Sequence, residues 1–136
     1  MIVVDTNVMA ALIIGGPDWD EASRLYELDQ EWAAPPLVLS ELCNVLLGHL
    51  RRGAITRARA VAMIENATLV LGDRLIDAPH ADVIDVALNC GLTAYDAEFV
   101  VVARQLGVSL ATADRAILRN APDVAAPLST LANGQA

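Results

Sequence analysis

The sequence predicts an α/β protein: a three-layer α/β/α sandwich around a central, mostly parallel sheet of four or five strands. Short β-branched or apolar segments alternate with longer segments of helical periodicity. The composition is 55% apolar, as expected when helices cover both faces of a sheet. The 136 residues contain no internal repeat, linker or low-complexity run, which predicts one domain spanning residues 1–136.

The first half of the chain is expected to contain two strands. Residues 2–4 are β-branched and too few for a helix, so they form the first strand. Asp5 ends this strand, and Thr6 or Asn7 is expected to cap the helix that follows. The other elements expected here are helices at 7–14, 18–28, 37–51 and 56–65 and a strand at 32–34.

The second half is expected to complete the sheet. Gly72 ends a candidate strand at 68–71, and Pro79 suits the first turn of a helix. Thr93 and Thr112 are expected to cap two later helices. The remaining elements are helices at 79–90, 94–106 and 112–118 and strands at 108–111 and 124–128, and the expected core face of the helix at 79–90 carries Val83, Ile84, Ala87 and Leu88.

The composition argues against several classes of protein. A net charge of −8 disfavours binding of nucleic acid through a broad positive surface, and every basic residue is arginine. No apolar run reaches the roughly 20 residues that cross a membrane, and no signal peptide is recognisable. Cys43 and Cys90 are isolated and are expected to be small buried side chains in a reducing, cytoplasmic environment.

Four acidic residues stand where an apolar element ends or where a helix is otherwise apolar. Asp5 and Asp114 follow predicted strands, and Asp96 and Glu41 lie early in apolar helices. Helix capping explains some of these positions singly. In a parallel sheet, however, all four would gather at one edge and raise each other's pKa. Arginine partners or a divalent metal would relieve this repulsion, and oxygen ligands favour Mg²⁺ or Mn²⁺.

Four segments carry a resemblance to a known family: VVDTNVMAAL, SEL, LTAYDAEFVVVARQLG and SLATADRAIL, which span almost the whole chain. They resemble the PIN domain, and within that family the VapC toxins of prokaryotic toxin–antitoxin pairs. The resemblance implies that Asp5, Glu41, Asp96 and Asp114 bind Mg²⁺ or Mn²⁺ and cleave RNA, with Asn7 and Thr112 as supporting polar residues. Some members carry a further ligand after the last aspartate, but Arg115, Ala116 and Ile117 follow here.

The expected function is that of an Mg²⁺-dependent endoribonuclease in which metal-activated water leaves a 3′-hydroxyl and a 5′-phosphate. RNA contacts are expected from the arginines near Gly53 and Asp114, namely Arg51, Arg52 and Arg115. The resemblance also implies an antitoxin that wraps a groove and reaches the acidic pocket, and a homodimer or a toxin–antitoxin hetero-oligomer.

Other interpretations use the same residues. A PIN-like scaffold would bind RNA or protein without cleaving it, although none of the four acids is missing. An RNA-processing PIN nuclease would act without an antitoxin. A regulator-type α/β domain with an acidic Mg²⁺ pocket would need adjacent acids after the first strand, where this chain has Asp5-Thr6-Asn7.

Overall fold

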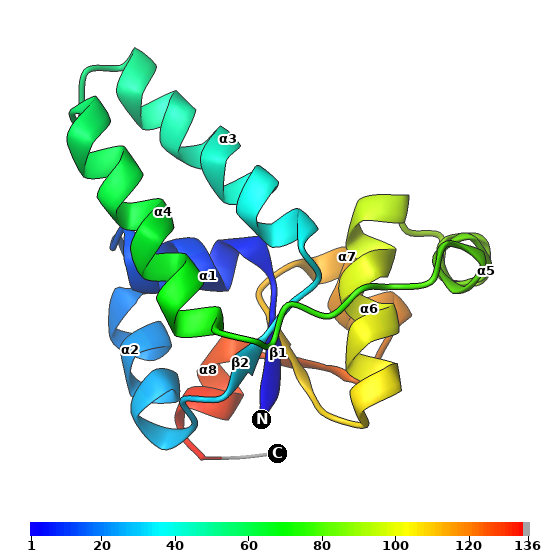
Figure 1. Ribbon diagram of the computed structural model, residues 1–136. Coiled ribbons are helices and arrows are strands. Elements are labelled where there is room, and N and C mark those ends of the chain that lie inside the picture. The colour runs from blue at the N-terminus through cyan, green and yellow to red at the C-terminus, as the bar shows by residue number, and fades with distance from the viewer. Residues whose placement is uncertain (135–136) are drawn as a thin grey trace.

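The computed structural model, which describes residues 1–134, contains a four-stranded sheet with helices on both faces (Figure 1). Each of its three strand pairings is parallel. The three-layer α/β/α sandwich predicted from the sequence is confirmed. The strands are β1 (Ile2–Val4), β2 (Trp32–Ala33), β3 (Leu110–Thr112) and β4 (Ala125–Pro127), in the order β2-β1-β3-β4.

The helices form two layers and a projecting pair (Figure 1). The helices are α1 (Thr6–Ile13), α2 (Trp19–Leu28), α3 (Leu37–Arg51), α4 (Arg57–Leu71), α5 (His80–Cys90), α6 (Ala94–Leu106), α7 (Arg115–Asn120) and α8 (Leu128–Ala132). Helix α6 packs on β1 and β3, and α5 covers its outer side. Helices α1 and α8 contact β3 from the other side, and α2 packs on α1 and α8. Helices α3 and α4 pack on each other and extend away from the sheet.

The two central strands are inaccessible to solvent. Val3, Val4, Leu110 and Ala111 are completely buried, because helices cover both faces and every strand residue therefore meets apolar neighbours. Helix α6 is buried in its apolar middle, between Ala97 and Ala103, while both of its ends reach the surface. The ends of β1 and β3 are thereby fixed, and so are the residues that follow them.

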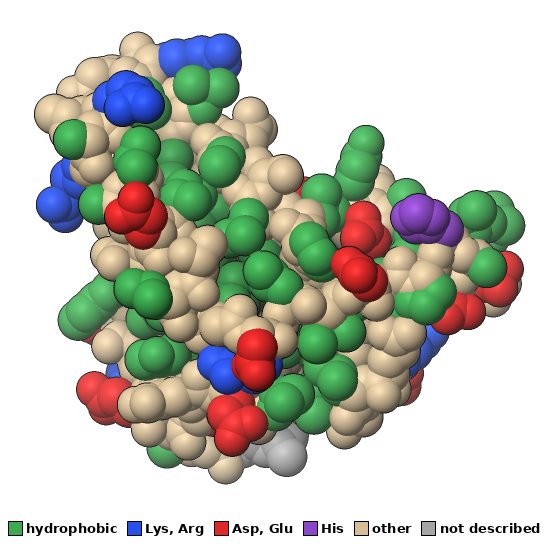
Figure 2. Space-filling model, in the orientation of Figure 1, with side chains coloured by type: hydrophobic (Ala, Val, Ile, Leu, Met, Phe, Trp, Pro, Cys, Tyr) green, Lys and Arg blue, Asp and Glu red, His purple; other side chains and the backbone are tan. Residues whose placement is uncertain are grey.

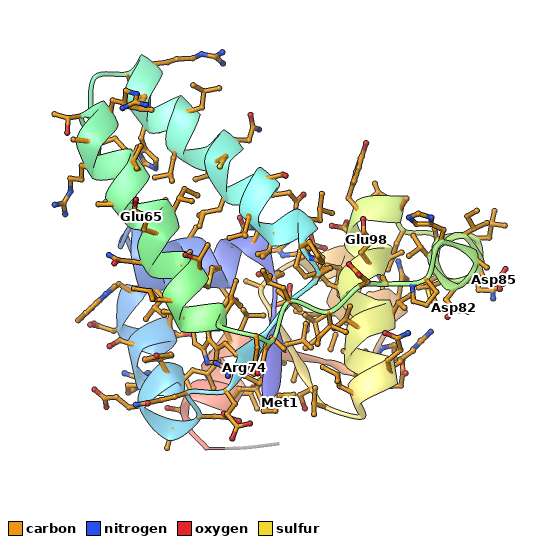
Figure 3. The ribbon with its side chains drawn as sticks, viewed as in Figure 1. Met1, Glu65, Arg74, Asp82, Asp85 and Glu98 are labelled. Carbon is orange, nitrogen blue, oxygen red and sulfur yellow. The ribbon has the colours of Figure 1, made fainter. Side chains whose placement is uncertain are left out.

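Arg74 holds the edge strand β2 in place from below the end of α4 (Figure 3). Its Nε donates a hydrogen bond to the carbonyl of Trp32 at 3.0 Å, and its Nη2 donates to the carbonyl of Val70 at 2.9 Å. The backbone of Ala34 also pairs with the segment after α4 through Arg74 and Ile76. These contacts fix the entry into α3, which carries Glu41.

The predicted strand at residues 68–71 is wrong, because these residues form the last turn of α4. Ala67 and Leu71 are fully buried, whereas Leu69 is 79% exposed. This spacing of four is the period of a helix and not of a strand. The Thr68 hydroxyl donates to the carbonyl of Glu65, so the β-branched side chain is accommodated within the helix.

The expected core face of α5 is partly wrong. Val83 and Val86 are buried, but Ile84 and Leu88 are 58% and 78% exposed. Helix α5 packs mainly on α6, so only one side of α5 is buried. Its other apolar side, with Ile84 and Leu88, faces outward, as do the labelled Asp82 and Asp85 (Figure 3).

The expected burial of the cysteines is also wrong, since Cys43 is exposed and Cys90 is half-buried. Cys43 lies on the side of α3 that meets the open space beside α4. Its isolation in the sequence gave no indication of which face of the helix it occupies.

No helix within residues 1–134 is by itself long and apolar enough to span a membrane. Helices α5 and α6 meet the length and composition criteria only as a pair, and they are bent by 109° at the break between them.

Candidate active site

The carboxyl ends of β1 and β3 open onto a cavity of about 400 Å³, between the starts of α3 and α6. The structure brings all four singled-out acids, Asp5, Glu41, Asp96 and Asp114, to the wall of this cavity. The rest of the wall is polar or apolar without charge: Thr6, Asn7, Leu37, Ser40, Asn44, Val45, Tyr95, Phe99 and Ile117.

Asp5 is the N-cap of α1, because its Oδ1 accepts a hydrogen bond from the backbone N–H of Val8 at 2.9 Å. The prediction that Thr6 or Asn7 caps this helix is therefore wrong by one or two residues. Both candidates already lie within the helix, and an aspartate caps as well as they do. Asp5 is only 6% exposed, so the cap places a carboxylate at the bottom of the cavity.

Thr112 connects two of the acids and is completely buried. Its hydroxyl donates to Oδ2 of Asp5 and accepts a hydrogen bond from the backbone N–H of Asp114 at 2.9 Å. Asp114, not Thr112 as predicted, is the N-cap of α7, and its Oδ1 accepts from the N–H of Ile117 at 3.0 Å. The supporting polar residue thus joins the two strand ends.

The other two acids come from helix starts. The hydroxyl of Thr6 donates to Oε1 of Glu41 at 2.6 Å, which ties α3 to α1. Asp96 lies in the first turn of α6, where its N–H donates to the hydroxyl of the Thr93 cap at 3.1 Å, as the sequence predicts. A carboxylate in a first helical turn is favoured by the helix dipole.

The cavity nevertheless raises the pKa values of Asp5 and Asp96. Burial raises the pKa of Asp5; the hydrogen bonds from Thr112 and Val8 oppose this change, and the charges of Asp114 and Asp96 add to it. Burial likewise raises the pKa of Asp96, and the charges of Asp114 and Glu41 add to this change, while the hydrogen bond with Thr93 lowers the pKa. The carboxylates are close enough to repel one another, so the charged cavity is electrostatically unfavourable by itself.

This fold agrees with comparisons to known proteins. The model of the PIN domain family matches residues 2–122. The chain belongs to the PIN domain family. It is 30% identical over 130 residues to ribonuclease VapC3 of Pyrobaculum aerophilum, which covers 93% of this chain and 98% of the relative. The crystal structure of PAE2754 from Pyrobaculum aerophilum superposes with a TM-score of 0.77, at 26% identity, over 98% of this chain and 94% of that one.

The PIN domain offers only oxygen donors at its cavity, which is the chemistry that Mg²⁺ and Mn²⁺ prefer. Within residues 1–134, however, no three His, Cys, Asp or Glu side chains are arranged to hold a metal ion as they stand. Several of the carboxylate oxygens accept hydrogen bonds from Val8, Thr112, Thr6 and Ile117. The donor set therefore fits a hard dication, and the side chains would have to turn toward it.

The structure adds lining residues that sequence reasoning missed. Ser40 and Asn44 lie one turn apart on α3 and flank Glu41 in the wall of the cavity. Asn44 follows Glu41 by three residues, a spacing on one helix face that could have indicated it, whereas the position of Ser40 directly before Glu41 gave no such signal. Thr6 gave no such signal, because its contact with Glu41 joins residues 35 positions apart.

The predicted RNA-contacting arginines lie outside the cavity wall of this PIN domain. Arg51 and Arg52 are exposed at the end of α3, about 15 Å along the helix from Glu41. The basic side chains gathered at the outer end of the α3–α4 pair are visible in Figure 2. Arg115 is exposed directly after Asp114.

The two histidines are not placed as ligands of this cavity. His49 lies near Arg52, whose Nη2 approaches its Nδ1 at 3.2 Å. His80 lines a neighbouring cavity with Glu98, which is labelled in Figure 3. Burial raises the pKa of Glu98, and the charge of His80 opposes this change.

Proposed function

We propose that this PIN domain is a metal-dependent endoribonuclease and the toxin of a toxin–antitoxin pair. The observation that carries the proposal is the cavity in which four carboxylates meet without a basic side chain in the wall. Structural acids are usually solvated or paired, whereas burial and the neighbouring carboxylates raise the pKa values of Asp5 and Asp96. Similarity to a ribonuclease over 93% of the chain supports RNA as the substrate.

The proposed cation ligands are Asp5, Asp96 and Asp114, with Glu41 as an additional or water-mediated ligand. A bound dication would neutralise the phosphodiester and lower the pKa of water. The side-chain amide of Asn7 would donate a hydrogen bond to the substrate or to one of the carboxylates. The hydroxyl of Thr112 keeps Asp5 oriented, and the hydroxyl of Thr6 keeps Glu41 oriented. Attack by water at phosphorus with departure of the 3′ oxygen leaves a 3′-hydroxyl and a 5′-phosphate.

The primary test is incubation of the purified protein with total RNA and Mg²⁺ or Mn²⁺, with a chelator control. We expect single-stranded regions to be cut with Mg²⁺ and to remain intact with chelator, and we expect the products to be ligatable through 5′-phosphates. The Asp96→Asn variant should fail to cut, because the cavity loses one charged ligand. Cleavage that persists with chelator and in this variant would contradict the mechanism.

A second prediction concerns metal binding independently of activity. Mg²⁺ or Mn²⁺ should raise the melting temperature of the wild-type protein in a concentration-dependent way, because the ion binds the folded state alone. The Asp96→Asn variant should show a smaller rise at the same ion concentration. Equal rises in both proteins would place the ion outside this cavity.

A third prediction concerns the arginines that we propose as phosphate contacts. The double variant Arg51→Gln/Arg52→Gln should reduce the slope of log affinity against log salt by about 1.4, because each contact to a single strand contributes about 0.7. Arg24→Gln on α2 removes an exposed arginine elsewhere and is the matched control. An unchanged slope in the double variant would show that Arg51 and Arg52 do not contact the RNA phosphates. The Arg115→Gln variant is tested in the same way.

We further propose that the antitoxin occupies the groove between α3 and α4. This groove has a volume of about 740 Å³, an apolar lining that includes Leu47 and Val61, and shared walls with the acidic cavity at Ser40 and Asn44. Apolar side chains between these helices are visible in Figure 2. An apolar segment could therefore fill the groove and extend a basic side chain to the carboxylates.

The test is inhibition of cleavage by the co-expressed product of an adjacent short reading frame. We expect Leu47→Asp and Val61→Asp to relieve inhibition while the free enzyme still cuts RNA. Leu69→Asp, at an exposed position outside the groove, should remain inhibited. Inhibition that survives both groove variants would place the partner elsewhere. The homodimer expected from the sequence stays a prediction for measurement of the mass in solution.

A further inference from the structure

An exposed aromatic ring stands at the rim of the acidic cavity. Tyr95 is the second residue of α6, lines the cavity and is 62% exposed. Its neighbour in sequence is Asp96, one of the four acids in the wall. Single exposed apolar residues are common on protein surfaces, so the position of this ring beside the carboxylates, and not its exposure alone, gives it meaning.

The cavity has an electrostatic difficulty as a site for RNA. Its wall carries four carboxylates and no arginine or histidine, while every linkage of the RNA carries a negative charge. A cation would attract the one phosphate it contacts, but the neighbouring phosphates still meet an acidic surface. The bases are uncharged, so stacking on an aromatic face can supply affinity that the charges cannot.

Tyr95 has the placement that such stacking needs. It projects from the first turn of a helix whose following residues are packed against the sheet, so its backbone is rigid. One turn further, Phe99 is buried and forms part of the cavity wall. The apolar side chains of Leu37 and Val45 enter the same wall from α3. A base lying on Tyr95 would therefore have its own phosphate close to Asp96.

We propose that Tyr95 is a stacking platform for a base next to the scissile phosphate of single-stranded RNA. This inference rests on the proposed ribonuclease function and assigns a positioning residue to it. Stacking is tolerant of sequence, but purines offer a larger face than pyrimidines. The platform should accordingly favour a purine at one position beside the cut.

Binding is tested with fluorescein-labelled oligoadenylate and oligouridylate of equal length, by anisotropy in Ca²⁺, with the RNA verified intact afterwards. We expect wild-type protein to bind oligoadenylate more tightly. Tyr95→Ala should weaken that binding about 30-fold, the middle of the range for one stacked base, and should reduce the preference for adenylate. Tyr95→Phe and Tyr95→Trp keep a ring and should retain wild-type affinity.

Kinetics give a second readout. With an RNA that the enzyme cuts, Tyr95→Ala should raise KM by about the same factor and change kcat little, as expected when uniform binding is lost. Leu69→Ala, an equally exposed truncation on α4, should change neither constant. Melting curves should coincide for all variants, since the Tyr95 side chain is mostly in solvent.

The outcomes separate this inference from the proposed function. If the wild-type protein cuts RNA but Tyr95→Ala binds and cuts as well as wild type, the stacking role is refuted while the nuclease stands. If Tyr95→Ala changes only inhibition by the antitoxin or the mass in solution, the ring belongs to a protein contact and the stacking role is again refuted. If wild-type protein neither binds nor cuts RNA, both proposals fail.

Discussion

Replacing Asp5 with asparagine is expected to abolish RNA cleavage while making the metal-free protein more stable. The loss of activity follows from the position of Asp5 at the bottom of the acidic cavity, buried and beside Asp96 and Asp114. A lost charged ligand removes several kcal/mol of stabilisation of the reacting phosphate, so we expect roughly a hundredfold or greater decrease in rate. The decrease in rate is measured by the cleavage of labelled RNA in Mg²⁺.

The gain in stability follows from the raised pKa of Asp5. A group whose pKa is higher in the folded protein binds its proton more tightly there, so stability falls as pH rises from about the ordinary value of 3.8 through the folded pKa. At neutral pH, above the ordinary value, the titratable side chain of Asp5 therefore costs the folded state free energy that an uncharged side chain would not cost. Asparagine removes that charge, and its Oδ1 can still accept from the N–H of Val8 and cap α1. Its Nδ2 cannot accept from the Thr112 hydroxyl as Oδ2 of Asp5 does, but it can donate to that hydroxyl instead, so the contact is reversed.

Asp29 provides a matched control at a site far from the cavity. Partial burial raises the pKa of Asp29, but hydrogen bonds from the Met1 ammonium and the N–H of Glu31 outweigh burial and lower this pKa below its ordinary value. Asp29→Asn should therefore lower stability at neutral pH and leave cleavage unchanged, the reverse of Asp5→Asn. Thermal melts of both variants without metal, at pH 4 and pH 7, measure the difference. A less stable Asp5→Asn protein at pH 7 would contradict the electrostatic account.

The sequence predicted the parts of the site that depend on strand ends. An aspartate after a short β-branched strand, as at Asp5, lies at the edge of a parallel sheet whichever neighbour it pairs with. The same argument placed Asp114. The cap assignments for α1 and α7 failed because aspartate and threonine are interchangeable as caps, and only the hydrogen bonds of Asp5 and Asp114 distinguish them.

Other features depend on contacts that no local pattern specifies. The rotation of α5 is set by how it packs on α6, so a helix with apolar residues on two sides could not reveal that Ile84 and Leu88 face outward. The position of Glu41 likewise depends on Arg74 and the pairing of Ala34 after α4. The residues alone singled out Glu41 as a carboxylate early in an apolar helix that needs a partner, and the family resemblance then implied its role in metal binding.

Thr112→Val is expected to cause the largest loss of stability among the cavity variants. The hydroxyl of this completely buried residue donates to Asp5 and accepts from the N–H of Asp114. Valine has nearly the same shape but leaves both partners unsatisfied in the interior. We expect the free energy of unfolding to fall by about 2–6 kcal/mol, the usual cost of leaving two buried polar groups without hydrogen-bond partners. Urea denaturation at neutral pH, with an unchanged m-value, measures it.

The loss should also depend on pH, because the Thr112 hydrogen bond lowers the pKa of Asp5. Without it the pKa of Asp5 rises further, so the charged form is penalised more and the deficit relative to wild type should be larger at pH 7 than at pH 4. If Asp5 must be ionised to hold a cation, the rising limb of the activity profile should move to higher pH. Thr112→Ser keeps the hydroxyl and should retain the wild-type profile. A Thr112→Val deficit that is the same at both pH values would mean that packing, and not the hydrogen bond to Asp5, gives Thr112 its importance.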